Sequence, residues 1–133
     1  MSGFILKQRI GDQAAFIAAG NYHHHIGLNT WKNNNGVSPP VDSTGLYHLA
    51  ILYPERKELA DAFQRLQSRN IILTGASDHG VSEALYLDDP DNNGVELYWD
   101  RPQNMWPKDE NQNLTMYTKP LDLRSLLAEV EKK

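Results

Sequence analysis

The chain has 133 residues, 13 of them basic and 17 acidic, which gives a formal net charge of −4, and it contains no cysteine. A chain of this length ordinarily forms one domain around a single core, so we expect one domain over residues 1–133. The acidic balance gives no reason to expect a nucleic acid or an anionic membrane as partner, because both select basic patches. The lack of cysteine excludes disulfides and thiolate metal sites.

The hydropathy of the chain favours a cytoplasmic protein. No apolar run is long enough to cross a bilayer. The first ten residues, MSGFILKQRI, have too short an apolar part, broken too early by charge, for a signal peptide. Any metal that the protein binds must therefore be held by His, Asp, Glu or other oxygen donors.

The first 31 residues are predicted to form three strands and no helix. The strands cover residues 3–10, 14–19 and 23–31, and are separated by Gly-Asp and Gly-Asn pairs that are typical of turns. Residues 33–40, with the sequence NNNGVSPP, are dense in residues that break regular structure and are predicted to form a loop or linker.

From residue 45 to residue 100 the predicted order is strand, helix, and then about three strands. Apolar residues at helical spacing, Leu59, Ala62, Phe63 and Leu66, mark the helix. The predicted elements are a strand over 46–53, a helix that starts at Pro54-Glu55 and closes near Asn70, strands that start at Ile71 and cover 82–87 and 95–99, a turn over 88–94, and a last short helix over 121–130.

His48 and Glu96 are candidate metal ligands on two of these strands. Side chains alternate along a strand, so Glu96 points away from its direct neighbours Val95 and Leu97. A carboxylate in apolar surroundings is costly to bury unless it is paired or binds a cation. The alternative is that Glu96 lies on a solvated face and His48 is a hydrogen-bonded histidine.

Residues 22–31, with the sequence YHHHIGLNTW, are a second candidate for metal or proton chemistry. In a strand, His23 and His25 face one way and His24 faces the other. Imidazole suits Zn, Fe, Ni and Cu, and Fe(II) oxygenases often use two His and one carboxylate. The alternative is a half-exposed strand with a polar face.

His79 lies just before the predicted strand that carries Tyr86. A histidine in this position can act as a general acid or base near neutral pH. The alternative is an inert histidine in a loop.

Six segments that cover nearly the whole chain carry a family resemblance. They are QAAFIAAG at 13–20, YHHHIGLNTW at 22–31, GLYHLAI at 45–51, DHGVS at 78–82, ALYLDDPDNNGVELYWDRP at 84–102 and MYTKPLDL at 116–123. Together they resemble the vicinal oxygen chelate superfamily, and especially its catechol-2,3-dioxygenase-like glyoxalase-family proteins. The resemblance implies an α+β fold of βαβββ modules, in which curved mixed sheet forms a cup with helices outside.

The resemblance also implies roles for five residues. Extradiol dioxygenases of the superfamily hold Fe(II) with two His and one Glu, and His48 and Glu96 match two of these ligands; Mn, Zn or Ni are alternatives to iron. Tyr86 matches the catalytic tyrosine, since 96 − 86 = 10, and His79 matches a substrate-binding histidine, since 79 − 48 = 31. His25 is the first choice for the histidine that assists oxygen activation.

The first module departs from the family pattern. Its opening strand, which carries the third ligand, and its helix are missing. We therefore expect a truncated first module over residues 1–31, a complete second module over 45–100, and a tail with a short helix over 101–133. An open sheet edge invites pairing with another chain, so a homodimer through this edge is expected.

The resemblance implies a metal-dependent, ring-cleaving (extradiol, catechol-type) dioxygenase or a related glyoxalase-family enzyme. Its substrate would be a small aromatic or vicinal-oxygen compound that binds the metal through two oxygens. Two alternatives remain open: a metal-free module that binds small molecules, and an inactive, truncated member of the family.

Overall fold

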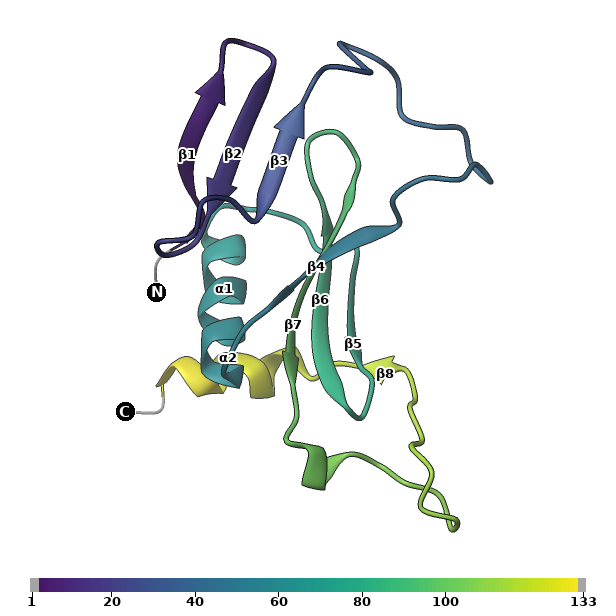
Figure 1. Cartoon of the computed structure of the whole chain (residues 1–133). Helices are drawn as coiled ribbons and strands as arrows, with labels where there is room; N and C mark the ends of the chain where they lie inside the picture. The colour runs from purple at the N-terminus through teal and green to yellow at the C-terminus, as the bar shows by residue number, and fades with distance from the viewer. Residues whose placement is uncertain (1–2, 132–133) are drawn as a thin grey trace. The chain divides into compact units, whose positions relative to one another are not determined.

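The computed structural model describes residues 3–131 of the chain, and the first two and last two residues of the predicted 1–133 domain lie outside the described residues. The chain divides into two compact units, Met1–Ser38 and Pro39–Lys133. The division falls within residues 33–40, which contain no helix or strand, as predicted for a loop or linker. The chain as a whole contains antiparallel and mixed sheet together with helices, which confirms the predicted α+β fold class (Figure 1).

The first unit contains an antiparallel sheet of three strands in the order β1-β2-β3. The strands are β1 (Ile5–Ile10), β2 (Ala14–Ala18) and β3 (Ile26–Asn29), so three strands without a helix are confirmed. Among the hydrophobic residues from Gly3 to Ser38, only Ala14 and Ala18 are buried, whereas many large apolar side chains are exposed: Phe4, Ile5, Leu6, Ile10, Tyr22, Leu28, Trp31 and Val37. Within the first unit itself, the sheet therefore buries little of its apolar surface.

The prediction of a strand from residue 23 is wrong, because β3 begins only at Ile26. His23, His24 and His25 lie in the turn that leads into β3, after Gly20, whose φ of 61° suits glycine. Their rings contact one another and Tyr22 instead of alternating across a sheet. The predicted sharing of one strand face by His23 and His25 is wrong for the same reason.

The second unit contains a sheet of five strands in the order β4-β7-β6-β5-β8. Its elements in chain order are β4 (His48–Leu52), α1 (Arg56–Ser68), β5 (Gly75–Asp78), β6 (Ser82–Asp88), β7 (Gly94–Asp100), a 3-10 helix (Gln103–Met105), β8 (Lys119–Pro120) and α2 (Leu123–Glu131). β4 pairs with β7 in parallel and the other neighbours are antiparallel. The predicted order of strand, helix and three strands is confirmed.

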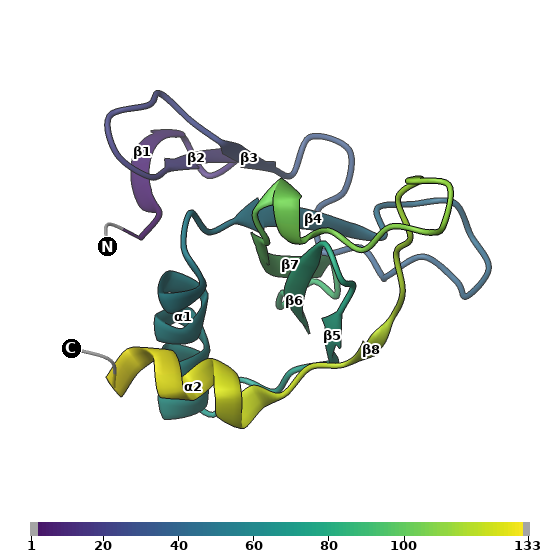
Figure 2. The same cartoon turned by 90° about the horizontal axis from the view of Figure 1, so that it is seen from below.

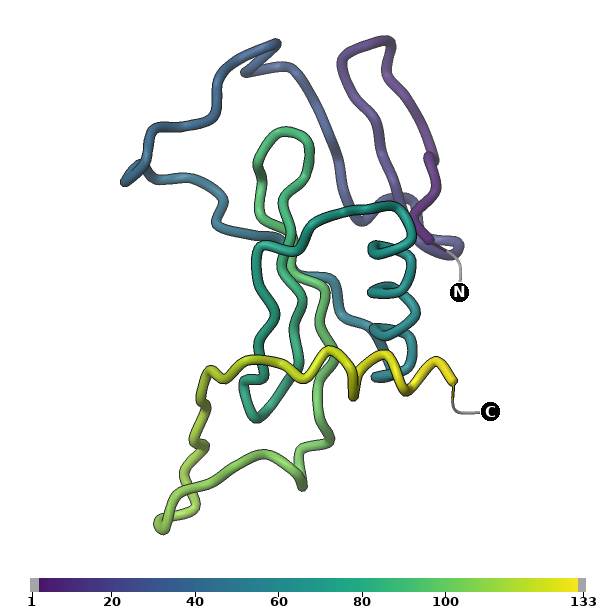
Figure 3. Tube along the Cα trace, turned by 180° about the vertical axis from the view of Figure 1, so that it is seen from behind, coloured from purple at the N-terminus to yellow at the C-terminus, as the bar shows by residue number. Residues whose placement is uncertain are grey.

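Both helices cover the same face of this sheet (Figure 2). The core joins Leu59, Ala60, Ala62 and Phe63 of α1 to Leu126 of α2 and to Leu85 and Leu97 of the sheet. α2 packs against α1, as the trace in Figure 3 shows. No helix among residues 3–131 is long and apolar enough to cross a membrane.

The end of α1 explains one difference from the predicted strands. Asn70 adopts a φ of 55° and its N–H bonds the carbonyl of Gln67, which closes the helix near the predicted residue. Ile71 donates back to Leu66, and residues 71–74 contain no strand. The strand predicted from Ile71 therefore starts later, at Gly75.

The register of the sheet brings the candidate residues together on the face opposite the helices. Tyr86 pairs with Glu96 across β6 and β7, and Glu96 pairs with Ala50 across β7 and β4. Val95, Leu97 and Trp99 pack into the core on the other face. The predicted alternation along residues 95–99 is thus confirmed, and Glu96 is directed away from the core.

Gly94 sets how closely β7 approaches β4, and we predict that Gly94→Ala destabilises the protein. A Cβ at this position would clash with the carbonyl oxygen of Tyr47 and would lie 3.0 Å from the Cβ of His48. We expect a loss of about 1–3 kcal/mol in the free energy of unfolding, measured by urea denaturation.

Gly45→Ala is the matched control for this prediction. A Cβ at Gly45 would meet only the ring of Pro39, at 3.9 Å, so its effect should stay within about 0.5 kcal/mol. Equal effects of the two substitutions would contradict the role given to Gly94.

Candidate functional site

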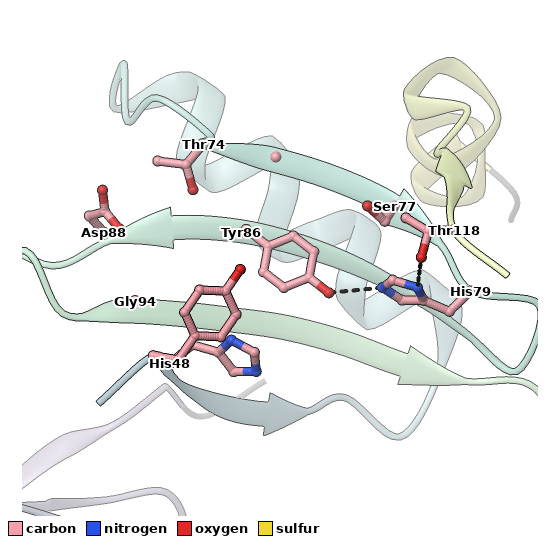
Figure 4. Close-up of a pocket in the computed structure, with 10 residues that line it drawn as sticks. His48, Thr74, Ser77, His79, Tyr86, Asp88, Gly94 and Thr118 are labelled. Carbon is pink, nitrogen blue, oxygen red and sulfur yellow. Dashed lines mark hydrogen bonds between the residues drawn. The ribbon is translucent and has the colours of Figure 1, made fainter. Parts of the chain in front are cut away.

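A cavity of about 450 Å³ opens on the sheet face opposite the helices. Side chains from β4, β5 and β6 and from the segment before β8 reach it, and Gly94 of β7 borders it (Figure 4). The residues that line it are Tyr47, His48, Thr74, Gly75, Ser77, His79, Tyr86, Asp88, Gly94 and Thr118. Three of the five predicted site residues, His48, His79 and Tyr86, are therefore brought to one cavity.

His48 and Glu96 form a close pair at one side of this cavity. The His48 Nε2 atom lies 3.0 Å from the Glu96 Oε2 atom, and the two side chains are 29% and 14% exposed. The other carboxylate oxygen, Oε1, accepts a hydrogen bond of 3.1 Å from the Tyr86 hydroxyl. Glu96 is thus mostly shielded from water and has polar partners at both oxygens, in contrast to the alternative of a solvated face.

A chain of hydrogen bonds continues from Tyr86 to His79 and Thr118 (Figure 4). The His79 Nε2 atom lies 2.9 Å from the Tyr86 hydroxyl, and its Nδ1 atom lies 3.2 Å from the Thr118 hydroxyl and 3.2 Å from the Tyr117 carbonyl. Because Tyr86 donates to Glu96, its oxygen can accept a hydrogen bond from the Nε2–H of His79. The Tyr86 hydroxyl therefore links the Glu96 carboxylate to the His79 ring.

The environment of Tyr86 keeps its phenol protonated at neutral pH. Burial raises the pKa of Tyr86 to about 12, with further contributions from the charge of Glu96 and the hydrogen bond to it. A phenol of this kind donates hydrogen bonds and does not act as an anion. Tyr86 can thus orient Glu96 and, through it, His48.

His48 and Glu96 fit two positions of a metal site. One imidazole and one carboxylate are two of the three donors in the two-His, one-carboxylate arrangement of Fe(II) oxygenases. Among residues 3–131, no group of three or more His, Cys, Asp or Glu side chains is placed to hold a metal ion. His48 and Glu96 thus have the donor types of such a site, but no third ligand lies beside them among residues 3–131.

His25 belongs to the first unit. Its Nδ1 atom accepts a hydrogen bond of 3.3 Å from the Ala19 N–H, and its ring packs against those of Phe4 and Tyr22. The catalytic role of His25 stays a prediction.

Sequence reasoning missed several residues that surround the site. Thr118 and Tyr117 hold His79, and Thr74 and Ser77 bring hydroxyl groups to the cavity. The segment 116–123 carried part of the family resemblance, but no residue in it was assigned a role. Tyr47, which also lines the cavity, could have been identified from its position directly before His48 in the segment 45–51.

A network of buried and half-buried ion pairs lies next to His79. Arg101 forms a two-pronged pair with Asp78, at 2.6 and 3.0 Å, and a further bond of 2.8 Å to Glu83. Arg56 binds the other oxygen of Glu83 at 2.7 Å and Glu129 at 2.8 Å. This network joins the turn after β5 to both helices.

Asp78→Asn is predicted to reduce the acid sensitivity of the protein. Partial burial raises the pKa of Asp78, but hydrogen bonds from Arg101 and Gly80 outweigh it, so the pKa lies below its usual value. A lowered folded pKa stabilises the protein above the unfolded value of about 3.9, and this stability is lost as the pH falls through the folded pKa.

The measurement is urea denaturation at neutral pH and at several values below about pH 4. The variant should be less stable than the wild type at neutral pH and should lose less stability on acidification. Asp91→Asn, at an exposed turn position, is the control. Identical pH profiles of wild type and Asp78→Asn would contradict the prediction.

Comparisons with known proteins show the family and the fold of the chain. Residues 3–97 match the Glyoxalase/Bleomycin resistance protein/Dioxygenase superfamily, and the chain belongs to this superfamily. The chain is 44% identical over 128 residues to a catechol-2,3-dioxygenase of Bacillus subtilis (strain 168), and 33% identical over 86 residues to a biphenyl-2,3-diol 1,2-dioxygenase 3 of Rhodococcus globerulus. These alignments cover 96% and 64% of this chain.

The chain spans less than half the length of these curated relatives: the alignments cover 44% and 45% of them. Solved structures show a similar fold. A glyoxalase/bleomycin resistance protein/dioxygenase from Alicyclobacillus acidocaldarius matches with a TM-score of 0.56 at 14% identity, covering 77% of each chain. A lactoylglutathione lyase from Agrobacterium tumefaciens matches with a TM-score of 0.53 at 17% identity, covering 72% of this chain and 75% of the other.

Proposed function

We propose that this protein is a metal-dependent, ring-cleaving dioxygenase of the extradiol, catechol type. The observation that carries the proposal is the row His48–Glu96–Tyr86–His79, in which neighbouring side chains contact one another and three of the four, His48, Tyr86 and His79, line one cavity. The likeness to the catechol-2,3-dioxygenase of Bacillus subtilis supports the reaction type. We propose Fe(II) as the metal, with Mn, Zn or Ni as alternatives.

The proposed metal site uses His48 and Glu96 as ligands. A divalent metal bound there would act as a Lewis acid that stabilises negative charge on vicinal oxygens, and would bind substrate and dioxygen next to each other. The Glu96 carboxylate would exchange its contact with His48 for the metal while it keeps its hydrogen bond to Tyr86. That hydrogen bond fixes the direction of one carboxylate oxygen, as partners of metal ligands commonly do.

Tyr86 and His79 are proposed to bind the substrate and move its proton. Their atoms lie 2.9 Å apart, so one substrate oxygen near Tyr86 can reach both groups. His79 can give a proton from Nε2, because the Thr118 hydroxyl can donate a hydrogen bond to its other nitrogen. His25 is proposed to assist oxygen activation.

The cavity suits a small neutral aromatic compound with two adjacent oxygens. Tyr47, His48 and Tyr86 supply ring faces, and Thr74, Ser77 and Thr118 supply hydroxyl groups. Neither Lys nor Arg is among the described residues that line it, so it offers a carboxylate or phosphate no charged partner.

Oxygen uptake with catechol tests the proposal. Protein loaded anaerobically with Fe(II) should consume dioxygen and form the yellow, ring-opened product, whereas protein treated with a chelator should not. Absence of turnover after loading with each of Fe, Mn, Zn and Ni would contradict the proposal.

A metal-free binding module is the second candidate. The absence of a three-ligand cluster among residues 3–131 favours it. Under this alternative the cavity would bind catechol-type ligands equally well with and without metal, which isothermal titration calorimetry measures. An inactive family member would show neither metal-dependent turnover nor ligand binding.

We also propose a homodimer that forms through the first sheet. Within the described residues β3 pairs only with β2, and apolar side chains such as Leu28 and Trp31 are exposed. An unpaired strand edge with exposed apolar residues favours pairing with a second chain. Sedimentation velocity should show a dimer, and a monomer at high concentration would contradict this proposal.

A cytoplasmic location of the protein remains a prediction.

A further inference from the structure

The turn between β5 and β6 carries His79 and is held by one arginine on both sides of that residue. Arg101 binds Asp78, the residue before His79, through two hydrogen bonds. On the other side the Arg101 N–H donates to the Val81 carbonyl at 2.8 Å. The two contacts fix the backbone before and after His79.

Asp78 closes the same turn from inside. Its Oδ1 atom accepts a hydrogen bond of 2.8 Å from the Gly80 N–H, while it also accepts from Arg101. Gly80 has a φ of 80°, a conformation that residues with side chains rarely adopt. The ion pair therefore holds the chain in a shape that aims the His79 ring at Tyr86.

Arg101 is itself held in place by buried groups of the second unit. Arg101 also binds Glu83, which is only 5% exposed, and Glu83 is held by Arg56 of α1. Arg56 in turn bonds Ser125 and Glu129 of α2. Because Glu83 has two cationic partners, the position of the Arg101 guanidinium is fixed from the side away from the cavity.

We propose that Asp78 and Arg101 are positioning residues for His79, which set the direction of its imidazole toward Tyr86 without touching the substrate. One hydrogen bond of 2.9 Å joins the His79 ring to the Tyr86 hydroxyl, so a small rotation of the turn breaks it. The inference rests on the proposed function only for its effect on substrate binding; the effect on His79 itself does not depend on it.

The matched comparison uses Arg101→Gln and Arg56→Gln. Each removes one cation beside the buried Glu83, but only Arg101 contacts Asp78. Arg101→Lys is the second variant: it keeps the charge beside Glu83 but cannot bind Asp78 and Glu83 together with a planar fork. It keeps the test decisive if Arg101→Gln does not fold.

The first measurement is the ring N–H proton of His79 in ¹⁵N-histidine-labelled protein by NMR. In the wild type and in Arg56→Gln we expect a slowly exchanging, low-field signal, and in both Arg101 variants we expect its loss. Thermal unfolding reports the stability lost in each variant. Loss of the signal in Arg56→Gln as well, or its retention in either folded Arg101 variant, would overturn the proposal.

The second measurement is catechol binding by titration calorimetry. Affinity should fall about tenfold or more in the Arg101 variants, a typical effect of removing a group that supports a site, and should stay near the wild-type value in Arg56→Gln. If the wild-type protein binds no catechol, the proposed function fails and the NMR result alone decides the positioning role.

Discussion

His48→Ala and Glu96→Ala are each expected to weaken metal binding by more than about 100-fold, beyond the loss typical for a residue that only supports a ligand. The two side chains are the imidazole and carboxylate donors of the proposed site and lie 3.0 Å apart. With only two ligands from this cluster, loss of either leaves a single donor. Competition with a fluorescent chelator measures the affinity of the wild type and of each variant.

Asp88→Asn is the matched control for the two ligand variants. Asp88 lines the same cavity and has the same charge as Glu96, but it is exposed and lies at the end of β6. We expect its metal affinity to stay within a few-fold of the wild type. A similar loss in Asp88→Asn would show that general charge attracts the metal, and the assignment of Glu96 as a ligand would fail.

Tyr86→Phe is expected to lower kcat by about 10²- to 10⁴-fold, the range for loss of a group that transfers a proton. The substitution removes the hydroxyl that bonds Glu96 at 3.1 Å and His79 at 2.9 Å, and leaves the ring in place. Because Glu96 and His48 remain, metal affinity should fall much less than kcat. Steady-state kinetics and a metal titration on the same preparation separate the two effects.

Tyr98→Phe is the control for this prediction. Tyr98 lies on β7 two residues after Glu96, so it shares the sheet face of Glu96, and it does not line the cavity. Its kcat should remain close to that of the wild type. Equal kcat values for Tyr86→Phe and Tyr98→Phe would contradict a catalytic role for Tyr86.

Periodicity and turn residues predicted much of the second unit. The alternation at 95–99 placed Glu96 opposite Leu97, and the Asp-Asn-Gly turn placed β6 beside β7, which brings Tyr86 across from Glu96. These features depend on residues close in sequence. That His48 and His79 belong to one site could be predicted only from the family resemblance, because His48 lies on β4, His79 follows β5, and these two strands do not pair with each other.

The features that could not be predicted depend on contacts between distant segments. Thr118 reaches His79 only because β8 pairs with β5, and a two-residue strand has no periodicity to recognise. The pair of Asp78 and Arg101 joins charges 23 positions apart. The histidine run was misassigned because a polar turn before Ile26 has the same composition as a polar strand face.

The central claim, a metal site at His48 and Glu96, is tested most directly by locating a bound metal ion. The measurement is NMR of ¹⁵N-histidine-labelled protein during titration with Mn(II). Paramagnetic broadening falls steeply with distance from the ion. We predict that the ring signals of His48 broaden first, followed by those of His79, and that Glu96→Ala abolishes this order. Broadening of His23 and His24 at low Mn(II), while the His48 signals stay sharp, would contradict a metal site at His48 and Glu96.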